Sequence, residues 1–344
     1  MRPYLTFLIS FLTAYVSMPV LRGIAIHFGI MDVPGGRKIH KVATPLLGGV
    51  AIYAGLLAGA FFNPGAIHTL IPILTGATLI LILGLANDVK EISAQSRLVL
   101  QVIIALLVTV MGERISFLPA GYWQDAVEVV ITVLWIVGVT NAYNYLDGLD
   151  GLAAGSAVVN LLCFGIILYA TGQNALVLLC IALGAACLGF LPHNFSRKKV
   201  FLGEAGSTVL GFVLAAIALT GNWAEDSTVK LTIPILILGV PIFDMIFTTV
   251  MRIKEEKIRT LIEWLRYGGK DHFHHYLVDL GFRPLGAVIF IYFIMLSLGI
   301  SAIMVSNDRA MEAVLSIAQA SIIFGIIATL IVVGKRRRSG WNQK

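Results

Sequence analysis

Four amide and carboxylate side chains stand at intervals of three residues where a long apolar segment ends. They lie in the stretch NAYNYLDGLDGLAAG and are Asn141, Asn144, Asp147 and Asp150. If the segment continues as a helix, residues three apart are neighbours on its surface, and the four side chains form one polar row. Capping or turn formation accounts for one such residue but not for four in register. Because ionisable groups at the mouth of a membrane span are functional candidates, the spacing predicts a ligand-binding site.

A second candidate site combines small residues with a carboxylate at the start of a helix. The stretch HNFSRKKVFLGEAGSTVLGF places Glu204 between glycines, immediately before an apolar segment. Free N–H groups and the dipole at a helix N-terminus can receive phosphate, and a glutamate can hold a hard cation such as Mg²⁺ that bridges phosphates. An N-terminal helix cap accounts for Ser207 equally well, so both interpretations stay open.

Three histidines stand within four residues in the longest polar loop, about residues 252–284. The sequence KDHFHHYL places them at His272, His274 and His275. A zinc site is disfavoured because the pattern lacks the i, i+4 spacing of a helical pair of zinc ligands and has no cysteine nearby. We therefore expect these side chains to contact a diphosphate. The preceding stretch RIKEEKIRTLIEWLRYGG has apolar residues at helical spacing and predicts an amphipathic helix at the membrane interface.

Two further polar loops carry candidates whose signals are weak alone. In MDVPGGRKIHKVATPLLGG, His40 and Lys41 fit either a substrate contact or a basic loop beside the membrane. In GLANDVKEISAQSRLVLQ, Asp88 stands at a helix mouth and Arg97 follows it. An aspartate at a helix end is also typical of a plain membrane interface. These loops gain weight if they share a face with the other three.

The elements that must position these groups are membrane-spanning helices. Of 344 residues, 58% are hydrophobic and 13% are charged, whereas soluble proteins carry about 25% charged residues. A bilayer core needs roughly 20 apolar residues per helix. Eleven segments are candidates, at about residues 4–21, 46–62, 68–86, 98–111, 126–141, 152–171, 175–192, 207–222, 231–251, 285–305 and 313–334. The sequence therefore predicts an all-α integral membrane protein with about eleven transmembrane helices.

The basic residues predict how the chain is oriented. With the N-terminus outside and the C-terminus cytoplasmic, only Arg2, Arg114, Lys230 and Arg309 of the 25 lysines and arginines fall outside, as the positive-inside rule requires. The protein's net charge of +6 then lies on its cytoplasmic side, in the plasma membrane, where it suits anionic lipids and anionic substrates. The sequence has no separate basic domain that would indicate binding to nucleic acid. We expect a single domain, residues 1–344, whose catalytic loops are cytoplasmic and lie at about 23–46, 87–97, 142–151, 193–206 and 252–284.

Taken in order, the five loops resemble those of the polyprenyl-phosphate N-acetylhexosamine-1-phosphate transferases, integral enzymes that start bacterial envelope glycan synthesis. The resemblance covers about residues 30–285. RKIHKVATPLLGG resembles the family's basic–His–Pro–Gly-Gly loop, GLANDVKEIS its paired-aspartate loop, and NAYNYLDGLDGLAAG its Asn–Asp signature. NFSRKKVFLGEAGSTVLGF is similar to the Phe-x-Gly-Asp-x-Gly-Ser element, and KDHFHHYL to the histidine motif.

The resemblance implies transfer of a sugar 1-phosphate from a UDP-sugar to undecaprenyl or another polyprenyl phosphate, with release of UMP. It also implies Mg²⁺ as cofactor, with Mn²⁺ as an alternative. The implied metal ligands are Asn144 and Glu204. The implied catalytic residues are Asp88, Asn87, Arg97, His272, His274 and His275, with Asp88 and Arg97 facing the lipid phosphate. The implied substrate-binding residues are Asn141, Asp147, Asp150, Asn194, His40 and Lys41, with Asp147 and Asp150 on the nucleotide.

Three positions depart from the family's pattern. Asn87 stands where the first Asp of a pair is usual, so it offers an oxygen but no negative charge and cannot act as a nucleophile. Glu204 replaces an Asp and is longer by one methylene. Leu46 and Leu47 precede the glycine pair where an Arg is common. Because only Asp88 is left at the paired position, direct displacement is favoured over a covalent intermediate on that aspartate.

Several alternatives stay open. The histidine motif is closer to the N-acetylglucosamine branch than to the muramoyl-pentapeptide branch, in which Phe-Glu follows three histidines, yet UDP-MurNAc-pentapeptide or another UDP-sugar is an alternative donor. A flippase for lipid-linked sugars or an inactive homologue is the rival of another class. Transporters commonly show repeats and broken helices near the midplane, whereas the polar groups of this chain gather at one face. A homodimer also stays open.

Overall fold

The computed structural model describes residues 2–33, 42–115, 121, 123–196, 199–267, 269, 271–306 and 310–341. Within these residues the chain forms helices and one antiparallel ribbon, in which β1 (Met31–Asp32) pairs with β2 (Thr44–Pro45). The first helices are α1 (Pro3–His27), α2 (Gly48–Phe61), α3 (Pro64–Val89), α4 (Ala94–Val110), α5 (Gln124–Leu146), α6 (Leu152–Ala170) and α7 (Asn174–Asn194). They are followed by α8 (Gly203–Thr220), α9 (Ser227–Ile237), α10 (Gly239–Lys254), α11 (Leu261–Arg266), α12 (Phe273–Asp279), α13 (Pro284–Val305) and α14 (Ala310–Trp341).

The predicted all-α membrane architecture is confirmed. Eight of the described helices are long and apolar enough to cross a membrane, and the bent pair of α9 and α10 makes nine if it is counted as one span. The shorter apolar helices α2 and α4 coincide with the two remaining predicted segments. Each apolar segment of the sequence is helical because in lipid a helix satisfies its own backbone hydrogen bonds.

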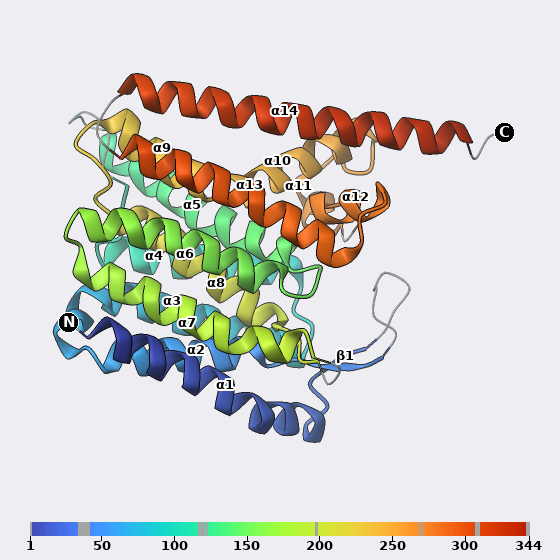
Figure 1. Cartoon of the computed structure of the whole chain (residues 1–344). Coiled ribbons are helices and arrows are strands. Elements are labelled where there is room, and N and C mark those ends of the chain that lie inside the picture. The colour runs from blue at the N-terminus through green and yellow to red at the C-terminus, as the bar shows by residue number, and fades with distance from the viewer. Residues whose placement is uncertain are drawn as a thin grey trace.

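The segment predicted at 231–251 is bent rather than straight. α9 and α10 meet at Leu238 and are inclined to each other by 75°. Pro241 has no N–H with which to continue the helical hydrogen bonds across the junction, and Pro234 removes another donor within α9. The bend lets α10 lead to the end of the bundle where α11 and α12 lie (Figure 1).

The amphipathic helix predicted after α10 is interrupted. α10 ends at Lys254, Glu256 has a φ of 54°, and α11 has only six residues. A capping box between Thr260 and Glu263 fixes the start of α11. The predicted helix is therefore divided between the end of α10 and the short α11, and a second short helix, α12, follows in the histidine segment.

The axes of the long helices are roughly aligned, with α1 and α14 on opposite flanks of the bundle (Figure 1). The N-terminus lies at one end of the bundle. The C-terminus lies at the other end with β1 and α12 (Figure 1), and we call this second end the site end. α8 is the central helix, since 83% of the residues in its apolar stretch are buried, compared with 17% in that of α14.

Close backbone contacts hold the first turn of α8. A Cβ on Gly49 of α2 would clash with Gly206, and a Cβ on Gly84 of α3 would clash with Ala205. Small residues allow such close approach between helices in membranes. Glu204, which lies in the same turn, is therefore placed by the packing of α2 and α3 against α8.

Candidate active site

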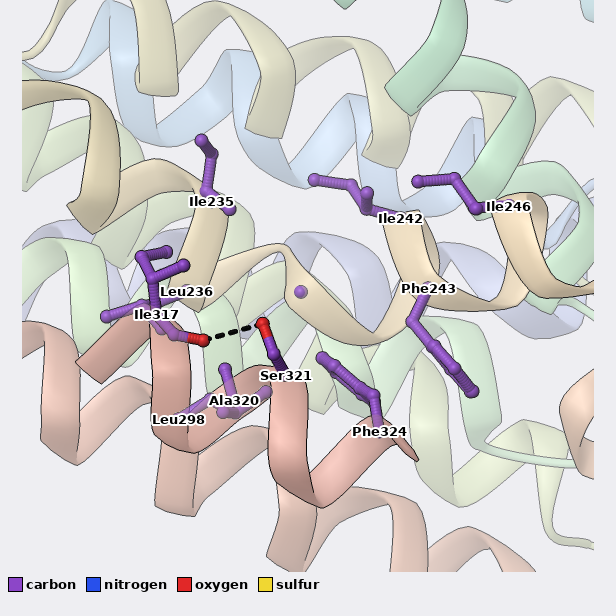
Figure 2. A pocket seen from close by; sticks show the side chains of 11 residues that line it. Ile235, Leu236, Ile242, Phe243, Ile246, Leu298, Ile317, Ala320, Ser321 and Phe324 are labelled. Carbon is purple, nitrogen blue, oxygen red and sulfur yellow. Dashed lines mark hydrogen bonds between the residues drawn. The ribbon is translucent and has the colours of Figure 1, made fainter. Parts of the chain in front are cut away.

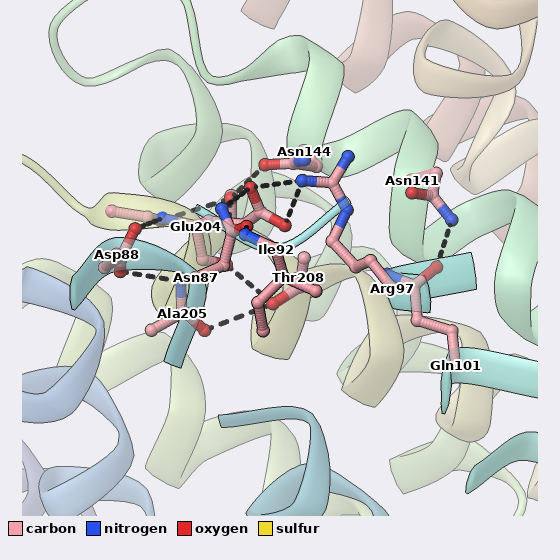
Figure 3. A network of polar contacts seen from close by, with 12 residues as sticks. Asn87, Asp88, Ile92, Arg97, Gln101, Asn141, Asn144, Glu204, Ala205 and Thr208 are labelled. Carbon is pink, nitrogen blue, oxygen red and sulfur yellow. Dashed lines mark hydrogen bonds and ion pairs between the residues drawn. The ribbon is translucent and has the colours of Figure 1, made fainter. Parts of the chain in front are cut away.

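Predicted site residues from four helices meet in one network of polar contacts (Figure 3). The last turn of α3 supplies Asn87 and Asp88, the start of α4 supplies Arg97, the end of α5 supplies Asn144, and the first turn of α8 supplies Glu204. Each residue stands near a helix terminus. Three of the five predicted catalytic loops are therefore brought together.

Glu204 is held by two side chains in this cluster. Arg97 Nη1 lies 2.7 Å from each of its carboxylate oxygens, and Asn87 Nδ2 donates to Oε2 at 2.8 Å. The Glu204 side chain is 14% exposed, and apart from the ion pair with Arg97 its Oε1 has no hydrogen bond of suitable geometry among the described residues. The guanidinium thus balances the charge of the carboxylate, while Oε1 keeps lone pairs for a further cation.

Asp88 caps α8 from the neighbouring helix. Its Oδ1 accepts from the backbone N–H of Glu204 at 2.9 Å, and its Oδ2 accepts from that of Ala205 at 3.1 Å. Gly203 has a φ of +75°, and a Cβ there would lie 2.6 Å from Asp88 Oδ2, so this approach requires glycine. The helix N-terminus that we expected to receive phosphate therefore holds a carboxylate, which the helix dipole stabilises.

The two asparagines of α5 have different partners. Asn144 Oδ1 accepts from Ser207 Oγ at 2.7 Å, and Figure 3 shows Asn144 beside Glu204. Asn141 Nδ2 donates to Gln101 Oε1 at 2.7 Å. Because α8 begins at Gly203, Ser207 lies inside the helix, and its interpretation as an N-terminal cap is wrong.

The predicted helical row of four polar residues is correct only for its first half. α5 ends at Leu146, and a turn in which Gly151 has a φ of +79° connects it to α6. Glycine favours this turn because it adopts positive φ without steric strain. Asp147 and Asp150 therefore lie in the turn, where Asp150 forms an ion pair with Lys199.

Asp147, in the turn after α5, has a raised pKa. Water reaches its side chain, but the protein around it reduces its hydration. This loss of hydration, together with the negative charges of Asp88, Asp150 and Asp32, raises the pKa of Asp147 to about 7. Strongly perturbed carboxyl groups are typical of functional sites.

Asn194, which we expected to bind substrate, connects two segments of the site. Its Oδ1 accepts from Gly151 N at 2.6 Å, and its Nδ2 donates to Val200 O at 3.0 Å. The residue is buried, so the structure gives it a connecting role. His40 and Lys41 lie outside the described residues.

The histidine segment contacts the cluster through Tyr145, the residue after Asn144. The rings of His272 and Tyr145 are stacked, with centroids 5.0 Å apart. His274 is 1% exposed, and neither of its ring nitrogens has a hydrogen-bond partner among the described residues. Burial and the neighbouring His275 lower the pKa of His274 to about 3, so this imidazole is neutral at physiological pH.

A buried carboxylate that no sequence motif singled out supports this segment. Asp244 of α10 accepts from Phe273 N at 2.6 Å, and its Oδ2 lies 3.0 Å from His272 Nδ1. Arg252 and Asp271 form a buried ion pair beside it, with Nη2 and Oδ1 2.6 Å apart. A lone carboxylate within an apolar span is the signal that marks Asp244 in the sequence.

An apolar pocket of about 240 Å³ lies at the bend between α9 and α10, facing α13 and α14 (Figure 2). The hydroxyl of Ser321 in its wall donates to Ile317 O at 2.8 Å, so the pocket presents little free polarity. Residues of its wall include Ile235, Leu236, Ile242, Phe243, Leu298 and Phe324. Phe243 precedes Asp244, and the pocket therefore adjoins the support of the histidine segment.

Known proteins share this sequence organisation. Residues 70–222 match the profile of glycosyl transferase family 4. The chain is 34% identical over 312 residues to the Bacillus subtilis protein named "Probable undecaprenyl-phosphate N-acetylglucosaminyl 1-phosphate transferase". This alignment covers 89% of this chain and 86% of that protein. It is 27% identical over 364 residues to the Mycobacterium tuberculosis "Decaprenyl-phosphate N-acetylglucosaminephosphotransferase", with 95% and 88% covered. It is 28% identical over 285 residues to the Escherichia coli K12 "Undecaprenyl-phosphate alpha-N-acetylglucosaminyl 1-phosphate transferase", with 78% and 75% covered.

The matches to the three relatives extend over 78% to 95% of the chain, and residues of three of the motifs meet in one polar cluster (Figure 3). The chain therefore belongs to the polyprenyl-phosphate N-acetylhexosamine-1-phosphate transferase family.

Proposed function

We propose that this chain transfers N-acetylglucosamine 1-phosphate from UDP-N-acetylglucosamine to a polyprenyl phosphate and releases UMP. The observation that carries the proposal is the cluster in which Glu204, Arg97, Asn87 and Asn144 from four helices meet (Figure 3). The names of the three relatives all contain N-acetylglucosamine and a polyprenyl phosphate. This supports UDP-N-acetylglucosamine over UDP-MurNAc-pentapeptide as the donor.

The oxygen donors of the site fit Mg²⁺. The described residues contain no group of three or more His, Cys, Asp or Glu side chains that could hold a metal, and Mg²⁺ is commonly bound by one or two carboxylates while it keeps waters and substrate phosphates. Glu204, through its carboxylate, and Asn144, through its amide oxygen, would hold the ion. Bound there, Mg²⁺ would neutralise charge on the donor diphosphate, and Mn²⁺ takes similar ligands.

The acceptor phosphate needs alignment more than a general base. Its second pKa is about 6, so it is largely dianionic at neutral pH. An acceptor oxygen forms a bond to the phosphorus that carries the sugar, the bond from this phosphorus to UMP breaks, and UMP takes the electron pair. Arg97 uses Nη1 on Glu204 and has further N–H donors for phosphate oxygens. Alignment and charge stabilisation supply most of the catalysis in such transfers.

The contacts of Asp88 support direct displacement. Both of its oxygens accept backbone N–H groups of α8, so a nucleophilic attack by this carboxylate would require it to leave the helix that it caps. We therefore assign Asp88 to holding the first turn of α8, and with it Glu204. Detection of a phospho-sugar adduct on Asp88 after mixing with donor alone would contradict this assignment.

The apolar pocket at the bend of α9 and α10 supplies a place for part of the polyprenyl chain (Figure 2). Its volume of about 240 Å³ is below the roughly 300–1,000 Å³ of pockets that enclose whole drug-sized ligands, so it would take one segment of the chain. Phe243 in its wall is next to Asp244, and the lipid would therefore run from the pocket toward the histidine segment.

We also propose eleven membrane crossings, with the N-terminus outside and the site end in the cytoplasm of a bacterial cell. The termini lie at opposite ends of the bundle (Figure 1), which agrees with an odd number of crossings. UDP-sugars are cytosolic, so a cytoplasmic site end lets a soluble donor meet a membrane acceptor.

The function is tested with protein purified in detergent, Mg²⁺, undecaprenyl phosphate and separate UDP-sugars. We expect UMP release with UDP-N-acetylglucosamine and formation of the lipid-linked diphosphate sugar. Glu204→Gln is the control and should abolish turnover. Release with UDP-MurNAc-pentapeptide alone would change the donor, and release with none of the sugars would contradict the proposal.

A further inference from the structure

A buried network joins α10 to the histidine segment. The two oxygens of Asp244 contact Phe273 N and His272 Nδ1, at 2.6 Å and 3.0 Å. On the other side of the imidazole, Arg252 Nη2 lies 3.2 Å from His272 Nε2. The same guanidinium binds Asp271 through Nε and Nη2, at 3.0 Å and 2.6 Å. All of these side chains are buried, so the contacts between them are not exchanged for water.

The partners of the two ring nitrogens determine where the proton of His272 lies. A guanidinium has only N–H donors and no acceptor. His272 Nε2 must therefore accept from Arg252 and carries no proton. Nδ1 then carries the proton and donates it to Asp244. Both nitrogens are used inside the protein, which leaves neither for substrate.

We propose that Asp244 is a positioning residue that holds His272 in its Nδ1-protonated form and thereby places the start of α12 against the end of α5. The inference rests on the proposed function for its effect on turnover. The stacked rings of His272 and Tyr145 connect the start of α12 to the end of α5. His274, in contrast, has both ring nitrogens without a partner among the described residues and stands over Gly148. Of these two histidines, His274 is therefore the one whose ring nitrogens are not used by partners within the described residues.

The proton position is measured in the full-length protein in detergent, without substrate, after labelling its histidines with ¹⁵N. Protonated and unprotonated ring nitrogens have well-separated ¹⁵N shifts, and the signals lost in His272→Gln identify this residue. We expect a protonated Nδ1 and an unprotonated Nε2. A proton on Nε2 would overturn the inference and leave the proposed function standing, because the measurement requires no turnover.

Two substitutions of His272 separate positioning from substrate contact. In His272→Asn the amide nitrogen takes the place of Nδ1 and can still donate to Asp244. In His272→Gln the amide nitrogen takes the place of Nε2 instead. We expect kcat to be about 10- to 100-fold lower in the Gln variant than in the Asn variant, which is the usual effect of losing an orienting partner. The reverse order would show that Nε2 serves the substrate and would overturn the inference.

Asp244→Asn provides the complementary test. Its amide nitrogen would face the Nδ1–H of His272, donor against donor, while its oxygen can still accept from Phe273. We expect a fall in kcat of about tenfold or more and a changed ¹⁵N spectrum of His272. Asp226→Asn, which alters the cap of α9, is the matched control and should keep wild-type values of both. An unchanged spectrum with unchanged kcat in Asp244→Asn would overturn the inference, and thermal melting shows whether each variant is folded.

Discussion

Asn87 and Glu204 are hydrogen-bonded to each other, with Asn87 Nδ2 2.8 Å from Glu204 Oε2. These are two of the three positions at which the chain departs from its family's motifs. The amide of Asn87 also accepts from Ile92 N at 2.9 Å, so it connects the loop after α3 to the carboxylate on α8. An aspartate at position 87 would place two carboxylates in this contact, and a shorter aspartate at position 204 would withdraw from it. The two departures therefore fit each other.

We expect the substitutions Asn87→Asp and Glu204→Asp to be coupled. Each alone should lower thermal stability in metal-free buffer, the first through repulsion between carboxylates and the second through loss of the hydrogen bond. The double variant should lose less than the sum of the two, with a coupling of about 1 kcal/mol or more, as is common for contacting side chains. Thermal melting of the four proteins measures this coupling. Additive losses would show that the two positions are independent.

Replacing Arg97 should increase the response of the protein to Mg²⁺. In Arg97→Met the carboxylate of Glu204 loses its guanidinium partner, and leaving a buried group unpaired costs about 1–3 kcal/mol or more for a charge. Mg²⁺ can then replace the missing charge, so the ion should raise the melting temperature of this variant more than that of the wild type. Arg114→Met, at the opposite end of the bundle, is the control. An equal rise in all three proteins would remove Glu204 from the metal site.

Asp147 should make the metal-free protein less stable as the pH rises. Its pKa is about 3.8 in the unfolded chain and about 7 in the fold, so the folded state holds the proton that the unfolded state has lost. Stability therefore falls between these two values and stays low above about pH 7. Asp147→Asn removes this effect. We expect its melting temperature, relative to the wild type, to be higher at pH 8 than at pH 5, and a pH-independent difference would contradict the raised pKa.

A side chain at position 148 should disturb the site without unfolding the protein. A Cβ there would clash with the ring of His274, which the surrounding packing holds in place. Displacing a group that contacts substrate by about 1 Å can lower the rate about 100-fold, so we expect a loss of this order in kcat/KM for Gly148→Ala. Gly138→Ala is the matched control in α5, because the nearest atom to its Cβ is Met245 Cε at 3.9 Å. Equal activities would place His274 away from the reaction.

Hydropathy predicted the helices because a span needs a long apolar run whatever its partners are. It could not predict the bend at Leu238, since proline within a membrane helix is also compatible with a straight span when neighbouring groups compensate. The end of α5 at Leu146 was missed for a related reason, because the spacing of three continues into a turn that Gly151 makes possible.

The motifs identified most of the clustered side chains but not their partners. The capping of α8 by Asp88 depends on α3 and α8 lying side by side, which no local pattern encodes. The assignment of all three histidines to catalysis failed to separate His272 from His274, because the difference lies in contacts from Asp244 and Arg252. In the sequence, Asp244 falls within the span predicted at 231–251 and Arg252 at the start of the predicted amphipathic helix, about 20 or more residues before His272.

Transfer from a soluble donor requires the motif loops to share one compartment, and this can be tested in intact cells. Single cysteines are introduced into a variant in which Cys163, Cys180 and Cys187 are replaced. With eleven crossings, cysteines at Ser93, Ser196 and Asn342 are cytoplasmic, so a membrane-impermeant thiol reagent should not label them until the cells are permeabilised. A cysteine at Ser227, in the first turn of α9 at the other end of the bundle, should be labelled in intact cells. Labelling of position 93 or 196 from outside would put donor and site on opposite sides of the membrane. Because the donor is soluble, transfer from a UDP-sugar would then have to be abandoned.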